Sequence, residues 1–327
     1  MAARPAPAAP LLAVRGLKLR FDTRRGVVRA LDGVSFEVAP GECVGLVGET
    51  GCGKSITARA VMGLVPAPGR IEGGEIRLDG RDLMALPAEE WRAVRGSQVA
   101  MIFQEPKRAL DPTATVGSQI VEAAMLARRI DRAEAKRLAL DTLRQVGLAD
   151  PERIMRTYAF ELSGGMAQRA MIAIAVVGGS RLIIADEPTS SLDVSIQAQI
   201  LRLLQDLRRR LGSALILITH DLGVAAENCD RIVVMYAGQI VEQAPARELF
   251  RAPAHPYTER LLRSLPRPGR DALSPIPGTV PDLIDPAPGC RFANRCERAG
   301  PDCAATPAMS EIGRRHFVAC YRPVRPT

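Results

Sequence analysis

Residues 48–55 read Gly-Glu-Thr-Gly-Cys-Gly-Lys-Ser, and this pattern constrains the fold more than any other feature of the chain. It matches G-x-x-x-x-G-K-S, a loop that needs a strand before it and a helix after it. The apolar run 44–47 predicts a buried strand, and residues from Ser55 to Pro66 have a helical pattern. Strand, glycine-rich loop and helix in this order predict an α/β fold that binds nucleotide phosphates.

The residue types of this loop suit a polyphosphate. Glycines allow successive backbone N–H groups to point at phosphate oxygens. Lys54 would place its charge on the β- and γ-phosphates, and Ser55 would offer its hydroxyl to Mg²⁺. The N-terminus of the following helix faces the same anion. We therefore expect the whole loop to bind the nucleotide: Gly48, Glu49, Thr50, Gly51, Cys52, Gly53, Lys54 and Ser55.

A second apolar run, residues 182–185, ends in two carboxylates. Ligands of open α/β sheets bind at the carboxyl ends of the strands, which is where Asp186 and Glu187 would lie. Asp186 would hold Mg²⁺, directly or through water. Glu187 would polarise the attacking water as general base. Gln104 follows another apolar run, 99–103, and is placed to reach the metal or the water.

A third motif is Ser163-Gly164-Gly165, which precedes a predicted helix over residues 167–177. Two glycines and a hydroxyl at a helix N-terminus can bind a second anion, although an ordinary helix cap has the same composition. One chain would then carry two phosphate-binding surfaces. A single ATP would be held between the loop of one copy and this motif of another.

Together these motifs resemble the nucleotide-binding subunit of an ABC transporter over residues 12–250. The resemblance implies that the nucleotide is ATP and that Gln104 is the glutamine of the Q-loop. It implies that Asp193 is the D-loop aspartate and that His220 is the switch histidine, a γ-phosphate contact. The implied Mg²⁺ ligands are Ser55, Gln104 and Asp186.

The resemblance also implies an aromatic side chain that stacks on adenine, before the phosphate loop. Phe21 is our candidate, and Arg25 competes with it under a different alignment.

Longer stretches resemble the dipeptide/oligopeptide importer ATPases: residues 101–106, 163–169 and 193–199 within the main domain, and 255–258 at the start of a C-terminal extension. Met166 replaces the glutamine of the general ABC signature, although Met is common there in this subfamily. The sequence departs from the subfamily pattern at Ala167, Ser191 and the pair 159–160. None of these positions is assigned to γ-phosphate chemistry, so we expect hydrolysis to be retained. The resemblance implies an ATPase that powers uptake of di- and oligopeptides.

The implied partners are a second ABC ATPase subunit, two transmembrane permease subunits and an extracytoplasmic substrate-binding protein. The second ATPase would be a copy or a homologue, and residues near 105–120 would contact the permease. No segment approaches the ~20 apolar residues of a membrane span, and the N-terminus lacks the apolar stretch of a secretory signal. We therefore expect a peripheral protein at the cytoplasmic face of the cell membrane.

The expected organisation has three parts. Residues 1–10 are a disordered leader, and residues 11–253 are a P-loop ABC-type nucleotide-binding domain of the α/β class. A helical subdomain over about 105–178 is inserted in it. Residues 254–327 form a small irregular C-terminal extension that contains cysteines, set apart by frequent Pro and Gly.

Four cysteines lie in this extension, separated by five, six and sixteen residues: Cys290, Cys296, Cys303 and Cys320. The spacing differs from a pair of C-x2-C zinc motifs, and a cytoplasmic location argues against disulfides. By itself the spacing leaves zinc, an iron–sulfur cluster and no metal open. The resemblance implies a [4Fe–4S] cluster held by these four residues.

Composition limits the alternatives. Aromatic residues make up only 4% of the chain, which argues against a base-stacking platform, and the net charge of +8 is scattered in pairs and triplets. We therefore expect no nucleic-acid partner. A soluble ABC ATPase acting on DNA or ribosomes is disfavoured, because a second nucleotide domain and long coiled coils are absent from the sequence. A transporter for nickel or another small solute, and a redox-sensing module, remain as rivals.

Overall fold

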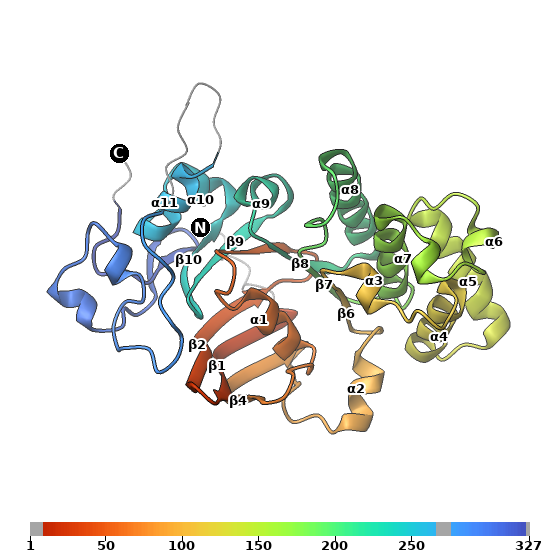
Figure 1. Ribbon diagram of the computed structural model, residues 1–327, viewed down its shortest axis with the longest axis horizontal. Coiled ribbons are helices and arrows are strands. Elements are labelled where there is room, and N and C mark those ends of the chain that lie inside the picture. Colours follow the sequence, from red (N-terminus) through yellow and green to blue (C-terminus); the bar gives the residue numbers. More distant parts are fainter. Residues whose placement is uncertain (1–8, 266–275, 325–327) are drawn as a thin grey trace, which may run out of the picture. The chain divides into compact units, whose positions relative to one another are not determined.

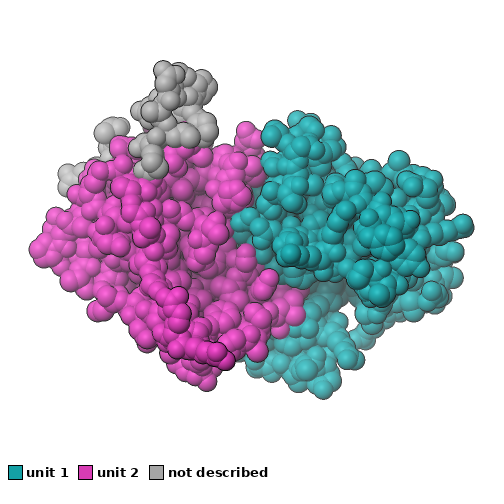
Figure 2. All heavy atoms as spheres, in the orientation of Figure 1, with its two compact units in different colours: residues 1–11, 38–42, 82–218 teal, residues 12–37, 43–81, 219–327 magenta. Residues whose placement is uncertain are grey.

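The computed structural model describes residues 9–265 and 276–324. These residues form two compact units, each assembled from several segments of the chain (Figure 2). Unit 1 contains residues up to Leu11, then 38–42 and 82–218; unit 2 contains 12–37, 43–81 and the residues from Thr219 onward. The predicted leader lies outside the described residues up to residue 8. The other predicted domain boundaries stay predictions.

Unit 2 contains the strand that leads into the phosphate loop, β3 (Cys43–Val47), in which every residue is buried. This strand pairs in parallel with β9 (Arg231–Tyr236), which turns back into the antiparallel strand β10 (Gln239–Pro245). The C-terminal strands β12 (His316–Val318) and β11 (Ser310–Gly313) continue the same sheet. The extension therefore adds its own strands to the sheet that carries the loop.

A second sheet of unit 2 has the order β2-β1-β4-β5. Its strands are β1 (Leu12–Thr23), β2 (Gly26–Val38), β4 (Gly69–Leu78) and β5 (Arg81–Asp82). Burial alternates along 34–38, where Val34, Phe36 and Val38 are buried between exposed residues. A period of two places these apolar side chains on one face of the strand.

The helices of unit 2 are short. They are α1 (Lys54–Val61), α9 (Leu222–Asn228), α10 (Ala246–Arg251) and α11 (Pro256–Arg263), with the 3-10 turns η2 (Ala293–Arg295) and η3 (Pro301–Ala304) in the extension. Pro256 occupies the first turn of α11, where its missing N–H costs no hydrogen bond.

Unit 1 is built on three parallel strands, β6 (Val99–Ile102), β7 (Leu182–Asp186) and β8 (Ala214–Thr219). All their residues are buried, as expected for parallel strands that are covered on both faces. Helix α8 (Val194–Leu211) connects β7 to β8 and buries one apolar stripe, which consists of Ile200, Leu201, Leu204 and Leu207. This arrangement confirms the α/β class.

The predicted helical region is present between β6 and β7 (Figure 1). It consists of α3 (Pro106–Ala109), α4 (Val116–Arg128), α5 (Arg132–Gln145), α6 (Pro151–Ile154), the turn η1 (Ala159–Glu161) and α7 (Gly164–Val176). Helix α2 (Ala88–Val94) precedes β6. Thr115 and Asp131 cap α4 and α5 by accepting a backbone N–H bond, so the helix starts follow from local sequence. Across the described residues, none of these helices combines the length and apolarity that a membrane span requires.

Candidate nucleotide-binding site

The phosphate loop follows β3 directly, and its glycines adopt conformations that other residues avoid. Gly48, Gly51 and Gly53 have φ of 151°, 81° and 108°. A Cβ at Gly48 would lie 2.2 Å from the carbonyl oxygen of Met235, and one at Gly53 would lie 2.8 Å from Leu31. The glycines are therefore required both for backbone conformation and for close approach to neighbouring residues.

Lys54 is the first residue of α1 and only 4% exposed. Its Nζ donates to the carbonyl oxygens of Gly48 at 2.8 Å and Glu49 at 3.0 Å. These bonds hold the ammonium group inside the loop. Burial raises the pKa of the neighbouring Cys52 thiol, so that residue stays neutral at pH 7. A glycine-lined loop with one fixed cation fits a phosphate chain, and Ser55 at the helix N-terminus fits a Mg²⁺ ligand.

In unit 1 the structure brings three of the predicted residues together. Asp186 is the last residue of β7 and 4% exposed, and Glu187 follows it with φ of 45°. The side-chain amide of Gln104, which comes after β6, donates to Oε2 of Glu187 at 3.1 Å. A positive φ costs free energy for a residue with a side chain and is typical of functional sites. Two acids and an amide thus gather at the carboxyl ends of adjacent parallel strands.

The Ser-Gly-Gly motif forms the start of α7. Ser163 is exposed, and its Oγ accepts a 3.3 Å bond from the N–H of Met166, so it acts as the helix cap. Asp193 caps α8 in the same way through Ile196 at 3.0 Å. This bond and one from Ser195 lower the pKa of Asp193. A Cβ on Gly165 would lie 3.3 Å from Ile196, so the starts of the two helices are close neighbours.

Comparison with known proteins decides the family. The region matching the "ABC transporter" family is residues 31–190, and "Oligopeptide/dipeptide transporter, C-terminal region" matches 241–303. A probable peptide ABC transporter ATP-binding protein of Sinorhizobium fredii is 52% identical over 95% of this chain and 95% of its own length. The chain belongs to the peptide-transporter family of ABC ATP-binding proteins.

Two further ABC proteins support this family assignment. The dipeptide transport ATP-binding protein DppD of Escherichia coli is 44% identical over 97% of this chain and 99% of its own. The solved ATP-binding cassette MJ0796, a dimer bound to ADP and phosphate, is 25% identical with a TM-score of 0.65 and covers 72% of this chain and 99% of its own. The chain is thus an ABC-type transport ATPase, as its motifs predicted.

Two further residues were predicted to contact the nucleotide of this ABC ATPase. His220 follows β8, is exposed and belongs to unit 2. Phe21 is half-buried on β1, opposite Gly69 of β4, whose added Cβ would lie 2.6 Å from the ring. The switch role of His220 and the adenine contact of Phe21 stay predictions, and so does the competing assignment of Arg25.

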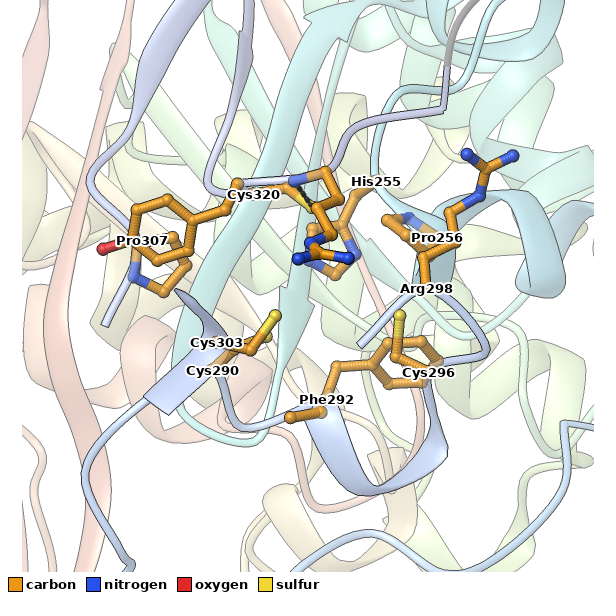
Figure 3. A pocket seen from close by; sticks show the side chains of 12 residues that line it. His255, Pro256, Cys290, Phe292, Cys296, Arg298, Cys303, Pro307 and Cys320 are labelled. Carbon is orange, nitrogen blue, oxygen red and sulfur yellow. Dashed lines mark hydrogen bonds between the residues drawn. The ribbon is translucent and has the colours of Figure 1, made fainter. Parts of the chain in front are cut away.

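The four late cysteines require a correction. All four do line one small pocket, together with Phe292 and Arg298 (Figure 3). However, no group of three or more His, Cys, Asp or Glu side chains among the described residues is arranged to hold a metal ion. The predicted [4Fe–4S] cluster is therefore wrong. Burial raises the pKa of the Cys290 and Cys296 thiols and raises that of Cys320 to about 11, which disfavours the thiolates that a cluster needs.

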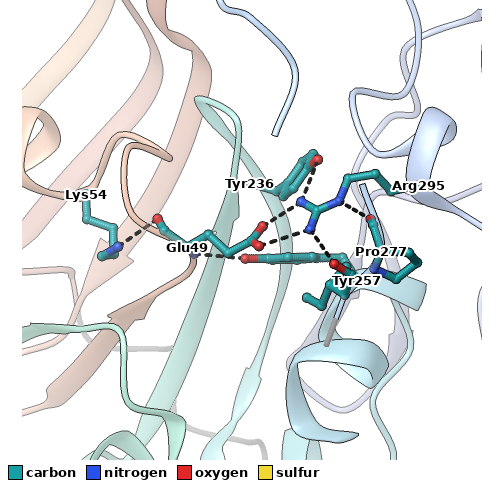
Figure 4. Close-up of polar contacts among 7 residues, drawn as sticks. Glu49, Lys54, Tyr236, Tyr257, Pro277 and Arg295 are labelled. Carbon is teal, nitrogen blue, oxygen red and sulfur yellow. Dashed lines mark hydrogen bonds and ion pairs between the residues drawn. The ribbon is translucent and has the colours of Figure 1, made fainter. Parts of the chain in front are cut away.

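Sequence reasoning missed two residues of the extension that contact the phosphate loop. The backbone N–H of Glu49 donates to the hydroxyl of Tyr257 at 2.9 Å, and Arg295 forms an ion pair with the Glu49 carboxylate at 2.8 Å (Figure 4). The available signal was the charge on Glu49 itself. A carboxylate inside a phosphate-binding loop needs a cationic partner, but its position in the sequence does not say which.

Proposed function

We propose that this chain is the ATP-hydrolysing subunit of an importer that powers uptake of di- and oligopeptides across the cytoplasmic membrane. The observation that supports it most strongly is the coverage of the match. Peptide-transport ATP-binding proteins align over nearly the whole chain, and the C-terminal region typical of that family is included. The chain also carries both groups of ATPase motifs, the phosphate loop in unit 2 and the acidic strand end in unit 1. The local geometry of each group suits its chemistry.

In unit 2, Lys54 neutralises the β- and γ-phosphates of ATP while the backbone N–H groups of the loop orient them. Ser55 supplies an oxygen ligand for Mg²⁺. Phe21 stacks on the adenine ring, and His220 donates a hydrogen bond to the γ-phosphate. The buried ammonium of Lys54 and the conformations of the loop glycines support the phosphate-binding role of the loop.

In unit 1, Glu187 takes a proton from the attacking water, and Gln104 orients its carboxylate. The support is the 3.1 Å bond between them and the positive φ of Glu187, which fixes where the carboxylate points. Asp186 and Gln104 are the Mg²⁺ ligands of this unit. When bound, Mg²⁺ offsets charge that develops on the phosphate oxygens.

The exposed Ser163 and Gly164 and the half-buried Gly165 of one chain contact the nucleotide held by the loop of another. Asp193 lies at the same surface, because the starts of α7 and α8 are neighbours. ATP therefore closes a dimer with a copy or a homologue, and hydrolysis reopens it. The exposed stacked rings of Tyr158 and Phe160, 5.6 Å apart, also lie next to this motif in sequence.

The assembly contains this subunit, a second ATPase, two transmembrane permease subunits and an extracytoplasmic substrate-binding protein. The chain sits on the cytoplasmic face of the membrane as a peripheral subunit, and residues near 105–120 contact the permease. Substrate choice lies with the permease and the binding protein.

The test is uptake of labelled dipeptides, oligopeptides and nickel in cells that carry either wild-type chain or Lys54→Ala. Loss of peptide uptake alone is the expected result. Loss of nickel uptake alone would keep the ATPase and overturn the substrate. Unchanged uptake of all three would overturn the proposed transport function. Glu152→Gln, a substitution of an exposed acid on α6, is the matched control and should leave uptake unchanged.

A further inference from the structure

The extension holds the phosphate loop through one residue, Glu49. Two groups of the extension meet at this position: the guanidinium of Arg295, from η2, and the hydroxyl of Tyr257, from α11 (Figure 4). Glu49 is the first variable position of the loop, directly after Gly48. Its backbone oxygen accepts a bond from Lys54 at 3.0 Å. Glu49 therefore links the phosphate-binding lysine to the C-terminal extension.

The ion pair is bidentate and nearly dry. The Nη1 of Arg295 lies 2.8 Å from Oε2 of Glu49, and Nη2 lies 3.1 Å from Oε1. Only 3% of the arginine side chain and 27% of the glutamate side chain are exposed. Paired planar groups of this kind are geometrically specific, because both N–H groups must align with both oxygens. The carboxylate is thus fixed in one direction.

The remaining donors of Arg295 are also used. They donate to Tyr236 Oη at 3.2 Å, to the carbonyl oxygen of Pro277 at 2.9 Å and to that of Ile276 at 3.3 Å. Tyr236 ends β9, the strand that pairs with β3. The guanidinium is therefore anchored from the sheet and from the extension before it reaches Glu49. Such an anchored cation cannot follow the carboxylate if the loop moves.

The aromatic residues around the pair make the anchor rigid. Tyr236, Tyr257 and Phe292 are almost completely buried, and their ring centroids are 4.6 to 5.4 Å apart. Burial raises the pKa of the Tyr257 hydroxyl, which keeps it neutral and able to accept the bond from Glu49 N–H. The cluster places Arg295 and Tyr257 on the same side of the loop residue that they bind.

We propose that Arg295 is a positioning residue for ATP binding: it neutralises Glu49 and keeps this carboxylate turned away from the nucleotide phosphates. An unpaired carboxylate in this loop would repel the polyphosphate and compete for the ammonium of Lys54. This inference rests on the proposed function, in which the loop of residues 48–55 binds ATP. Arg295 touches no part of the nucleotide itself and acts through Glu49.

The experiment measures equilibrium binding of MgATP and MgADP to the full-length chain, with thermal unfolding of the nucleotide-free protein in parallel. Four variants are compared with wild type: Arg295→Met, Glu49→Gln, the double variant, and Arg298→Met. Arg298 is an exposed arginine three residues further along the extension and serves as the control for loss of a positive charge.

Arg295→Met should weaken binding of both nucleotides about tenfold, a typical coupling between neighbouring charged residues. Glu49→Gln alone should change affinity by less than about threefold, because the amide carries no charge. The double variant should recover affinity to within about threefold of wild type, because the repelling charge is gone. Arg298→Met should match wild type.

The double variant separates this role from a structural one. If Arg295 only held the extension in place, Glu49→Gln would not restore binding in its absence, and that outcome would overturn the proposal. Unchanged affinity of Arg295→Met would overturn it as well. Lys54→Ala distinguishes a failure of the proposed nucleotide site from a failure of the proposed role of Arg295. If it still binds ATP like wild type, the proposed nucleotide site fails; if it loses ATP while Arg295→Met does not, only the role of Arg295 fails.

Discussion

The side-chain amide of Gln104 donates a 3.1 Å hydrogen bond to the carboxylate of Glu187, although the two residues are 83 positions apart in the sequence. The relationship arises because β6 and β7 are parallel neighbours and each residue follows the carboxyl end of its strand. This bond fixes the direction of the carboxylate that would accept a proton from water. This geometry makes Glu187 the first residue to test.

Glu187→Gln should bind MgATP with near wild-type affinity and hydrolyse it at least about a hundredfold more slowly, the usual contribution of a general base. The amide keeps the shape of the side chain but cannot take a proton. ATP should then hold the protein as a closed dimer, detectable by size-exclusion chromatography. Phosphate release measures the rate, and near-normal turnover would remove Glu187 as the base.

Asp186→Asn should shift the Mg²⁺ dependence of ATP hydrolysis to higher metal concentration, because a neutral amide is a weaker ligand than a carboxylate for a hard cation. The measurement is a Mg²⁺ titration at fixed ATP. Asp206→Asn, on an exposed part of α8, is the control and should titrate like wild type. Identical curves for Asp186→Asn and wild type would contradict the metal role.

Gly48→Ala should abolish nucleotide binding and lower the free energy of unfolding by at least about 2 kcal/mol. The added Cβ would lie 2.2 Å from the carbonyl oxygen of Met235, at a backbone φ of 151°. Gly73→Ala is the matched control, because its Cβ would meet nothing within 4 Å. Urea unfolding and ATP titration report the two effects, and equal stability of both variants would argue against the close packing.

Stability should fall on acidification because of His255. Burial lowers its pKa from 6.5 to about 4. The unfolded chain therefore binds a proton that the folded chain excludes in this interval. The contribution of neutral His255 to the free energy of unfolding is fully present above pH 6.5. It is lost as the pH falls towards 4, to a total of about 3 kcal/mol. Urea unfolding at pH 7 and pH 5 measures it.

The matched variant is His255→Asn, which keeps a side-chain acceptor at the helix start where His255 accepts from Tyr257 N–H at 3.0 Å. The variant should lose less stability than wild type between pH 7 and pH 5. Equal losses in the two proteins would assign the acid sensitivity to other groups. The buried carboxylate of Glu242 accepts from the backbone N–H of His255 and lies 2.7 Å from Nε2 of His316, so the pH dependence of variants at Glu242 and His316 is measured in the same way.

The phosphate loop, the acidic strand end and the Ser-Gly-Gly motif at the start of a helix were predictable because each depends on residues that are close in sequence. Apolar runs predicted β3, β6 and β7, and parallel pairing then placed the carboxyl ends of neighbouring strands at one edge within each unit. Turn glycines and helix caps likewise act over a few residues. Family membership followed from these motifs in their order.

The partners of buried charges were decided only by the tertiary structure. Glu49 and Arg295 are 246 positions apart, and Glu242 and His316 are 74 apart, so no periodicity connects them. The cysteines show the opposite limit: all four line one pocket, yet among the described residues they are not arranged to hold a metal ion. Local sequence determines which backbone elements form, whereas burial of a charged or sulfur-bearing side chain depends on where a distant segment returns.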